Sequence, residues 1–310
     1  MADTPQSTDL PQREEPHREE GLSIAELIHR KLDSLTPSER KAARLLLTNY
    51  PVVGLDSLAR FAERSEVSHP TILRFISKLG FTGYPQFQDE LRDELDARLK
   101  SPLAKEHPVI SNTSDKKDFQ NTYIDAVCKN IRKSMASISQ GEFEGVLALL
   151  EDINQQVFLL GGRFTDSIAT QTYMHLRALR PRVRHISGLP VSWSEYLLDM
   201  DKQCVLVVFD IRRYQHEVVV FAEEAARRGA SVILVTDQWL SPIARIAQHV
   251  LVAHVDAPSN WDSLTSISAM METFIAALSN RKWDQLKGRI ADLEQIRSLF
   301  KSDNRLDSLT

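Results

Sequence analysis

The chain has 310 residues, is 42% hydrophobic and 26% charged, and carries a net charge of −4 at pH 7. This composition is typical of a globular protein of about two domains, and it excludes a polycation that would bind nucleic acid over its whole surface. The N-terminal segment lacks the apolar stretch of a secretory signal, and no run approaches the roughly 20 apolar residues of a membrane span. We therefore expect a cytoplasmic protein without membrane contact.

The two cysteines, Cys128 and Cys204, lie far apart and in no spacing that metal sites or redox pairs use. We expect buried, inert thiols and neither a metal nor another cofactor. Nothing in this cysteine usage requires an oxidising compartment.

A polar N-terminal segment precedes the first residues whose apolar side chains recur with the helical period. Residues 1–20 combine Pro, Gln, Glu and Arg with few apolar side chains, which predicts a disordered tail. From 21 to 100 the apolar residues follow the helical period, which predicts an all-α domain. Residues 101–118 hold two prolines, small polar residues and charge, and are expected to form a linker.

A capping pattern marks one helix of this domain. Thr36 is followed by Pro37 at the first helical position, and Glu39 stands three residues after the cap, as in a capping box. Pro51 marks the end of this helix or lies just beyond it. Further helices are expected at 56–66 and 84–100.

The segment VSHPTILRFISKLG, residues 67–80, carries two positive charges and no carboxylate. With the short helix before it, it has the proportions of a helix-turn-helix, in which Ala62 allows close approach, Ser68 caps the second helix and Gly80 ends it. The turn position that often requires a positive φ holds Glu66 instead of Gly, which indicates either strain or a different turn. The apolar stripe of the second helix is expected to consist of Ile72, Phe75, Ile76 and Leu79.

The opposite face of this second helix is predicted to meet the major groove of double-stranded DNA. A carboxylate there would face phosphates, whereas Arg and Lys gain from counterion release. The alternative is a small helical bundle with no role at DNA. The predicted contacts to bases and phosphates are Ser68, His69, Thr71, Arg74 and Lys78. The predicted secondary contacts to the DNA backbone are Arg40, Lys41, Arg44, Arg60 and Arg64.

The pattern LTxxER followed by VSxxTxxRFxxKLGFxGY resembles the N-terminal domain of the RpiR/MurR family of bacterial transcriptional regulators, over about residues 22–95. The resemblance implies operator binding by this domain. In that family a sugar isomerase (SIS) domain follows, and the second half of this chain occupies its place.

The second half, residues 119–310, alternates apolar strands with helices. Such a pattern predicts a parallel sheet covered on both faces, a three-layer α/β/α domain. The resemblance implies that this domain is of SIS type. The expected strands cover 156–161, 182–186, 204–210, 231–237 and 249–255. The expected helices cover 119–139, 165–179, 191–199, 214–228, 241–247, 263–280 and about 283–301.

Two loops of this domain depart from the pattern that SIS domains use to hold a phosphosugar, G-x-G-x-S and S-x-S-G-x-T. The first reads GGRFTDS (161–167), with Gly161 at the first glycine, Arg163 at the second and Thr165 at the serine. The second reads DIRRYQ (210–215) and has lost the hydroxyl groups. In this second loop the places of Ser, Ser, Gly and Thr are taken by Asp210, Arg212, Arg213 and Gln215.

Three interpretations of these loops stay open. The arginines grip a small anionic metabolite, since guanidinium binds carboxylate and phosphate in two places. Alternatively, an internal pair of Asp210 with an arginine closes the pocket, or the arginines lie at a subunit interface. Asp262 and Ser263 are further pocket candidates or helix caps, whereas Asp237 and Ser241 are expected to cap or end elements.

A sugar-phosphate isomerase is the competing class, but none of the histidines or glutamates available as a general base stands in a distinctive spacing. An architectural DNA binder without an effector would need more basic charge, and a regulator whose SIS-like domain only oligomerises and binds no ligand stays as the alternative. The sequence therefore predicts a transcriptional regulator, not an enzyme, that forms a homodimer or homotetramer. Its expected partners are double-stranded DNA and a small anionic metabolite.

Overall fold

The computed structural model describes residues 23–99 and 116–300. The chain divides into two compact units, Met1–Leu95 and Asp96–Thr310. The predicted tail and residues 101–115 of the predicted linker lie outside the described residues. None of the described helices is long and apolar enough to cross a membrane.

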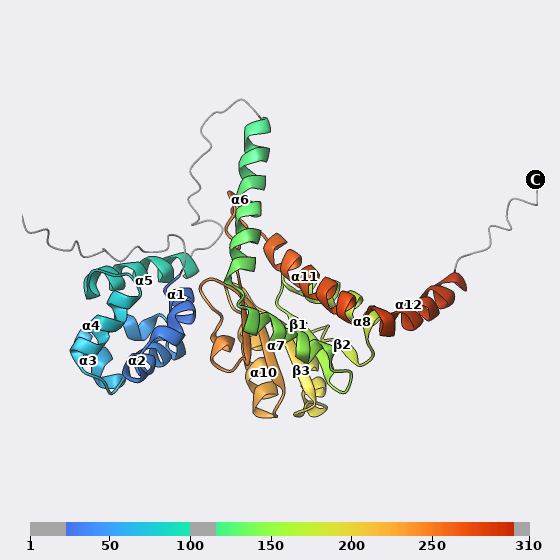
Figure 1. The fold of residues 1–310 in the computed structure, drawn as a ribbon, viewed down its shortest axis with the longest axis horizontal. Helices are drawn as coiled ribbons and strands as arrows, with labels where there is room; N and C mark the ends of the chain where they lie inside the picture. Colours follow the sequence, from blue (N-terminus) through green and yellow to red (C-terminus); the bar gives the residue numbers. More distant parts are fainter. Residues whose placement is uncertain (1–22, 100–115, 301–310) are drawn as a thin grey trace, which may run out of the picture. The chain divides into compact units, whose positions relative to one another are not determined.

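The first unit is entirely helical in its described part, as predicted (Figure 1). Its core is built around phenylalanine side chains that are fully buried, among them Phe61, Phe75 and Phe87. The elements are α1 (Ile24–Lys31), η1 (Leu32–Ser34), α2 (Pro37–Thr48), η2 (Val52–Leu55), α3 (Leu58–Arg64), α4 (His69–Lys78) and α5 (Tyr84–Leu99), where η denotes a 3-10 helix.

The predicted capping box at the start of α2 is confirmed. The Thr36 hydroxyl accepts a hydrogen bond from the Glu39 backbone N–H at 3.4 Å, and the Glu39 carboxylate accepts from the Thr36 N–H at 2.8 Å. Two backbone donors that a helix start leaves unpaired are thereby satisfied.

The second unit contains a five-stranded sheet in which every pair is parallel, in the order β2-β1-β3-β4-β5. The predicted α/β fold is thus confirmed. The strands are β1 (Gln156–Gly161), β2 (Val183–His185), β3 (Cys204–Phe209), β4 (Ser231–Asp237) and β5 (His249–Ala253). The other elements are α6 (Lys116–Ser137), α7 (Gln140–Glu151), α8 (Asp166–Leu179), η3 (Pro190–Trp193), α9 (Ser194–Leu198), α10 (His216–Arg227), η4 (Pro242–Arg245), α11 (Thr265–Arg281) and α12 (Trp283–Ser298).

Alternate residues of the central strands point to two separate cores, one on each face of the sheet. In β3, Val205 and Val207 pack with α7, α8 and α11, whereas Leu206 and Val208 pack with α9, α10 and η4. Since both faces are covered, the central strands β1, β3 and β4 are apolar along most of their length, whereas the edge strand β2 contains Arg184 and His185.

The predicted elements of this unit need three corrections. The predicted helix 241–247 is the 3-10 helix η4, and 191–199 divides into η3 and α9. Helix α7 was not predicted at all, although Ser139 caps it by accepting from the Glu142 N–H at 3.2 Å. The cap and the apolar run that follows it are the signals that would have found α7.

Gly161 is required by the approach of helix α8 to the end of β1. A Cβ atom built at Gly161 would lie 2.4 Å from the Cα and the backbone N of Asp166. These are backbone atoms, so no side-chain rotation can relieve the contact. Gly288, within α12, has no atom within 4 Å of the same built position.

We predict that Gly161→Ala lowers the free energy of unfolding of the second unit by about 1–3 kcal/mol, the usual cost of overpacking. Gly288→Ala is the control and should raise it by about 0.5–1 kcal/mol, because Ala is the better helix former. All four tryptophans lie in the second unit, so urea unfolding followed by tryptophan fluorescence reports on that unit alone. Equal effects of the two substitutions would contradict the steric argument.

Candidate functional site

Helices α3 and α4 each end in the same hydrogen-bonded turn. After α3 the Val67 N–H donates to the Ala62 carbonyl at 3.0 Å, and after α4 the Phe81 N–H donates to the Ile76 carbonyl at 3.2 Å. Gly80 supplies the left-handed residue in the second case with φ of 100°, and Glu66 supplies it in the first with φ of 54°. The helix-turn-helix therefore keeps the turn geometry in which Gly is usual, and Glu66 adopts it with the side chain present.

The solvent-facing side of α4 carries the predicted reading residues Ser68, His69 and Arg74, all exposed. The Arg74 guanidinium donates to the Thr71 hydroxyl at 3.3 Å, and no carboxylate among the described residues pairs with it. A cation with a neutral partner keeps its charge available for a phosphate or a guanine edge.

Three sequence-based expectations for α4 are corrected. Thr71 is buried, with 6% of its surface exposed, because it lies beside Ile72 on the packed arc of the helix. Ser68 occupies the cap position, but its hydroxyl pairs with the Thr71 hydroxyl at 2.9 Å and makes no capping bond. Lys78 donates to the buried Glu39 carboxylate at 2.7 Å, so its charge is used inside the unit.

The ion pair with Lys78 helps to lower the pKa of the Glu39 carboxyl. Burial acts to raise its pKa, but hydrogen bonds from Lys78 and Thr36 more than offset this and hold the pKa below its ordinary 4.5. Lys78 thus ties the end of α4 to the start of α2.

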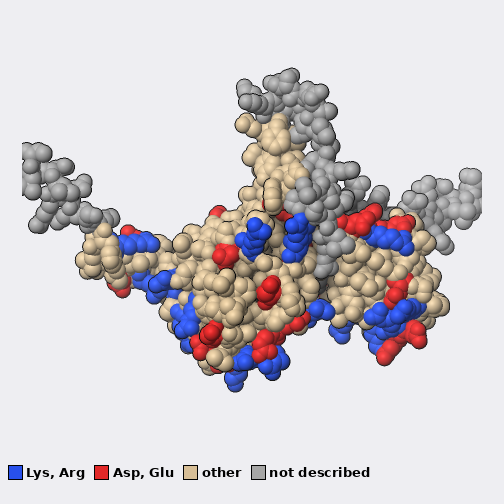
Figure 2. All heavy atoms as spheres, turned by 180° about the vertical axis from the view of Figure 1, so that it is seen from behind, with Lys and Arg blue, Asp and Glu red and all other residues tan. Residues whose placement is uncertain are grey.

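The predicted backbone contacts differ in how free their charges are. Arg64 and Arg60 both pair with Asp56, at 2.9 and 3.8 Å, and Arg44 is exposed. On the face drawn in Figure 2, positive and negative side chains are interspersed, without a continuous field of one sign. The net charge of −4 implies that any contact with DNA is local.

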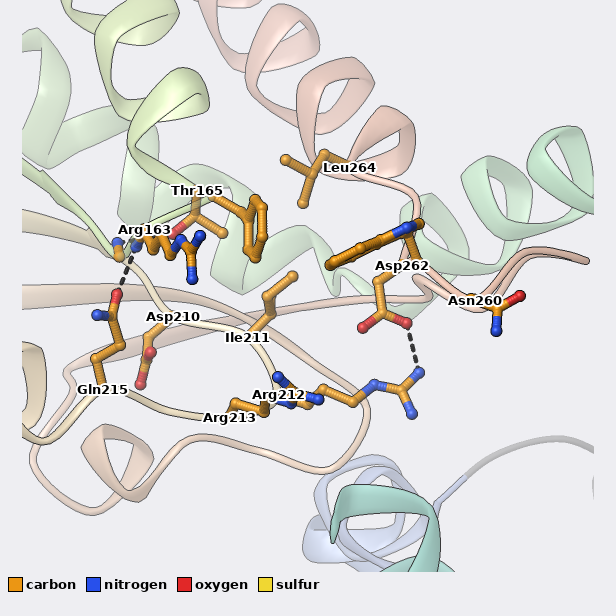
Figure 3. Close-up of a pocket in the computed structure, with 13 residues that line it drawn as sticks. Arg163, Thr165, Asp210, Ile211, Arg212, Arg213, Gln215, Asn260, Asp262 and Leu264 are labelled. Carbon is orange, nitrogen blue, oxygen red and sulfur yellow. Dashed lines mark hydrogen bonds and ion pairs between the residues drawn. The ribbon is translucent and has the colours of Figure 1, made fainter. Parts of the chain in front are cut away.

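The second site is a pocket of about 490 Å³ at the carboxyl ends of the strands (Figure 3). It lies where loops follow β1 and β3, the two strands at which the chain order of the sheet reverses, which is where open α/β sheets bind ligands. A third loop, after β5, completes it. The lining residues are Gly162, Arg163, Phe164, Thr165, Asp210, Ile211, Arg212, Arg213, Gln215, Asn260, Trp261, Asp262 and Leu264.

The polar groups of the first loop are occupied by the protein itself. The Thr165 hydroxyl accepts from the Gly162 N–H at 2.8 Å and donates to the Phe209 carbonyl at 2.6 Å. The Arg163 N–H donates to the side-chain oxygen of Gln215 (Figure 3). The expectation that the Thr165 hydroxyl replaces a ligand-binding serine is therefore corrected, because this hydroxyl fastens the loop to β3.

The second loop is held by the buried carboxylate of Asp237 at the end of β4. This group accepts from the Arg212 N–H, from the Tyr214 hydroxyl at 2.7 Å and from the Trp239 N–H at 3.1 Å. Burial raises the pKa of Asp237 to about 6 in spite of these bonds. Asp237 therefore holds the loop and does not line the pocket, and Ser241 caps η4 by accepting from the Ile243 N–H, both as expected.

Arg212 is buried and pairs with two carboxylates, at 2.5 Å from Asp256 and 2.6 Å from Asp262. Its guanidinium also lies 3.9 Å from the centre of the Trp239 ring. Asp210, which was the expected partner, accepts a hydrogen bond from the Ser241 hydroxyl at 2.5 Å. The ion pair with Asp256 and Asp262 leaves the pocket open, so the closed-pocket interpretation is not what the geometry favours.

Two more of the predicted ligand-binding residues do not line the pocket. Gly161 does not line the pocket, and its neighbour Gly162 does. Ser263 is buried outside the lining, where its hydroxyl accepts from the Thr265 N–H at 3.4 Å near the start of α11. Asp262 lines the pocket, which agrees with the first of its two predicted roles, pocket residue or helix cap.

The sequence analysis missed the aromatic part of this site. Phe164 and Trp261 line the pocket with 55% and 58% of their surfaces exposed, and their ring centres are 5.7 Å apart, edge to face. A Phe inside the loop GGRFTDS and a Trp in PSNWDS could have been noted as large apolar residues in polar loops. Their meeting could not be known, because 97 residues separate them.

The loop after β5 is connected to helix α6. The Asn130 side chain donates to the Asp256 carbonyl at 2.5 Å, and the His254 N–H donates to the Ser134 hydroxyl at 2.8 Å. Asp256 therefore contacts both Arg212, through its carboxylate, and α6, through its carbonyl. Within the described residues, no group of three or more His, Cys, Asp or Glu could hold a metal.

Comparisons with known proteins match both units. A model of the "Helix-turn-helix domain, rpiR family" matches residues 22–98, and a SIS domain model matches 149–278. The transcriptional regulator HexR of Pseudomonas aeruginosa is 26% identical over 77% of this chain and 81% of its own length. The "Bifunctional protein glk" of Burkholderia mallei is 24% identical over 79% of this chain but only 37% of its own length.

Solved structures support the same fold. The sugar isomerase domain of an RpiR transcription factor from Sphaerobacter thermophilus has a TM-score of 0.54 at 19% identity, over 58% of this chain and 99% of that one. The Vibrio vulnificus NanR protein complexed with ManNAc-6P has a TM-score of 0.52 at 13% identity, over 91% of this chain and 100% of that one.

The raised pKa of Asp237 predicts a measurable pH dependence. A folded pKa above the ordinary 3.8 means that the folded state binds the proton more tightly, so this group lowers stability as pH rises from about 4 to about 6. This rise in the pKa of Asp237 corresponds to about 3 kcal/mol of folding free energy. The stability difference between wild type and Asp237→Asn, from fluorescence-monitored unfolding, should fall by this order between pH 4 and 6.5. Asp284→Asn, at an exposed position of α12, is the control and should give a constant difference.

Proposed function

Because the chain belongs to the RpiR family of helix-turn-helix transcriptional regulators with a SIS domain, we propose that it binds operator DNA through α4 and responds to a small anionic metabolite. The observation that carries the DNA part is the exposed Arg74, which donates to the neutral hydroxyl of Thr71 and pairs with no carboxylate in the described part of the chain. The observation that supports the effector part is the open pocket at the reversal point of the sheet.

In the proposed complex the start of α4 enters the major groove. Ser68 and His69 lie at this end, where recognition helices meet base edges, and Arg74 lies about one and a half turns further on. Arg44 and Arg60 are proposed to contact phosphates, and Arg64 less so because Asp56 pairs with it closely. Lys78 and Thr71 are proposed to act indirectly, by fixing α4 and the side chain of Arg74.

We propose that the protein acts as a homodimer or homotetramer, since two recognition helices would then meet half-sites about 34 Å apart. The end of helix α12 and the two residues after it offer an apolar surface for self-association, because Ile296, Leu299 and Phe300 are 53%, 79% and 81% exposed. Side chains of this kind are usually covered by a partner.

The pocket is proposed to bind its ligand without converting it. A general base would have to come from the lining, whose carboxylates in the described part are Asp210 and Asp262. Ser241 donates to the first of these and Arg212 to the second. Both carboxylates therefore have structural roles that hold the surrounding loops.

The effector signal is proposed to pass through Arg212 to helix α6. A ligand held by Arg163 and Arg213 can shift the loop after β3, in which Arg212 pairs with Asp256, whose carbonyl accepts the hydrogen bond from Asn130 of α6. Helix α6 directly follows the segment that joins the two units in the chain. An effect on DNA affinity requires only that the ligand favours one of two arrangements of this connection.

We predict that Arg74→Ala weakens binding to DNA selected by the wild-type protein from a random pool by about 1–3 kcal/mol, the usual value of a base-reading arginine. The measurement is a gel-shift titration at fixed salt. Arg92→Ala, at an exposed position of α5, is the control and should bind as the wild type does. If Arg92→Ala weakens binding and Arg74→Ala does not, α4 is not the reading helix.

The coupling route gives a separate prediction. Asn130→Ala should leave ligand binding unchanged but reduce the ligand's effect on DNA affinity, since it removes the bond from α6 to Asp256. The ligand is found by thermal shift of the full chain with small anions, where 100 times the dissociation constant stabilises by about 2.7 kcal/mol. Asn121→Ala, at an exposed position of α6, should leave both properties intact. A full response in Asn130→Ala would contradict the route.

A further inference from the structure

We infer that the pocket of the second unit selects a carboxylate carried on a flat aromatic body, which Phe164 and Trp261 hold, in preference to a phosphosugar. The inference rests on the proposed function, of which it names the ligand class. Four observations on the described residues carry it.

The first observation is that the protein fills its own phosphate cradle. A phosphate at the start of α8 would need free backbone N–H groups and hydroxyls. The Gly162 N–H and the Thr165 hydroxyl bond to each other, and Gln215 accepts from the Arg163 N–H. The Gln215 oxygen would lie 2.5 Å from a Cβ built on Gly162, so its side chain lies directly on this loop. The first residue of α8 is the carboxylate Asp166, which repels an added anion there.

The second observation is the exposure of two large aromatic side chains at one pocket. Phe164 and Trp261 come from loops after different strands, meet edge to face at 5.7 Å, and each expose more than half of their surface. Leu264 and Ile211 also line the pocket and point into the same central space (Figure 3). An aromatic ring placed there would cover this apolar surface and gain both its burial and ring–ring contacts.

The third observation is the position of two arginines on the lining. Within the described chain no carboxylate pairs with Arg163 or Arg213, and both side chains are exposed, whereas Arg212 is neutralised by Asp256 and Asp262. Arg213 adopts a left-handed backbone with φ of 64°, which costs free energy for a residue with a side chain. A carboxylate is a good partner for such guanidinium groups.

The fourth observation concerns the groups that could read sugar hydroxyls. Thr165, Gln215, Asp210 and Asp262 all line the pocket, but each is bonded to another part of the protein, and Asn260 is the further neutral polar side chain of the lining. A polyol would have to share most of these partners with the protein, which replaces only part of the hydrogen bonds that it loses to water. A flat aromatic body has no such requirement.

The experiment is isothermal titration calorimetry on the full chain. The probes are phenylacetate and 1-naphthylacetate, with acetate as the anion without a ring, 1-naphthylethanol as the ring without the charge, and glucose 6-phosphate and ManNAc-6P as phosphosugars. We expect at least one aromatic acid to bind tenfold or more tightly than acetate, the alcohol and both phosphosugars.

Matched variants assign the binding to this pocket. Trp261→Ala and Arg163→Gln should each weaken the binding of the aromatic acid at least tenfold. Their controls are Trp283→Ala, a half-exposed tryptophan of α12, and Arg132→Gln, an exposed arginine of α6, and both should bind as the wild type does. All four positions are exposed, so the variants are expected to fold, which their tryptophan fluorescence and unfolding midpoints verify.

The remaining outcomes overturn the inference in distinguishable ways. A phosphosugar that binds more tightly than every aromatic acid overturns the ligand class and leaves the proposed anionic effector intact. Aromatic acid binding that survives Trp261→Ala overturns the site. If no anion binds, both the inference and the effector part of the proposed function fail, whereas the gel-shift test of Arg74 still decides the DNA part.

Discussion

The buried carboxylate of Asp237 is the interaction on which the second unit's site depends. It lies at the end of β4 and accepts hydrogen bonds from Arg212, Tyr214 and Trp239, so that one group fixes both the loop after β3 and the loop after β4. Burying a charge is expensive unless donors surround it, and the raised pKa shows that burial still outweighs them here. The buried carboxylate therefore lowers the stability of the unit, but it holds the two loops after β3 and β4 in place.

The fixed loop places Arg212 between Trp239 and two carboxylates. The cluster of Arg212 with Asp256 and Asp262 carries one more negative than positive charge, and the exposed cations of the lining are Arg163 and Arg213. This arrangement separates two tasks. Arg212 connects the loop after β3 to the loop after β5, and the other two arginines face the cavity.

The first unit shows a similar division among its basic residues. Lys78 is tied to Glu39 and holds α4 against α2, whereas Arg74 extends into solvent beside the neutral Thr71. A lysine and an arginine only four residues apart on one helix thus have different roles. The helix-turn-helix is held firmly by its buried phenylalanines and by two matching turns, one of which bends through Glu66.

The sequence by itself determined the all-α first unit, the capping box at Thr36, the helix-turn-helix and the parallel sheet, because each leaves a local signal in residue period or turn chemistry. It also located both loops of the pocket and the exposed positions of His69 and Arg74. Only the tertiary structure decided which charges are available, since Lys78 and Glu39 are separated by 39 residues and Arg212 and Asp262 by 50. The same holds for the rings of Phe164 and Trp261, which no local pattern brings together. Ion pairs and ring contacts form between distant segments, and the packing of the whole unit decides which of them meet.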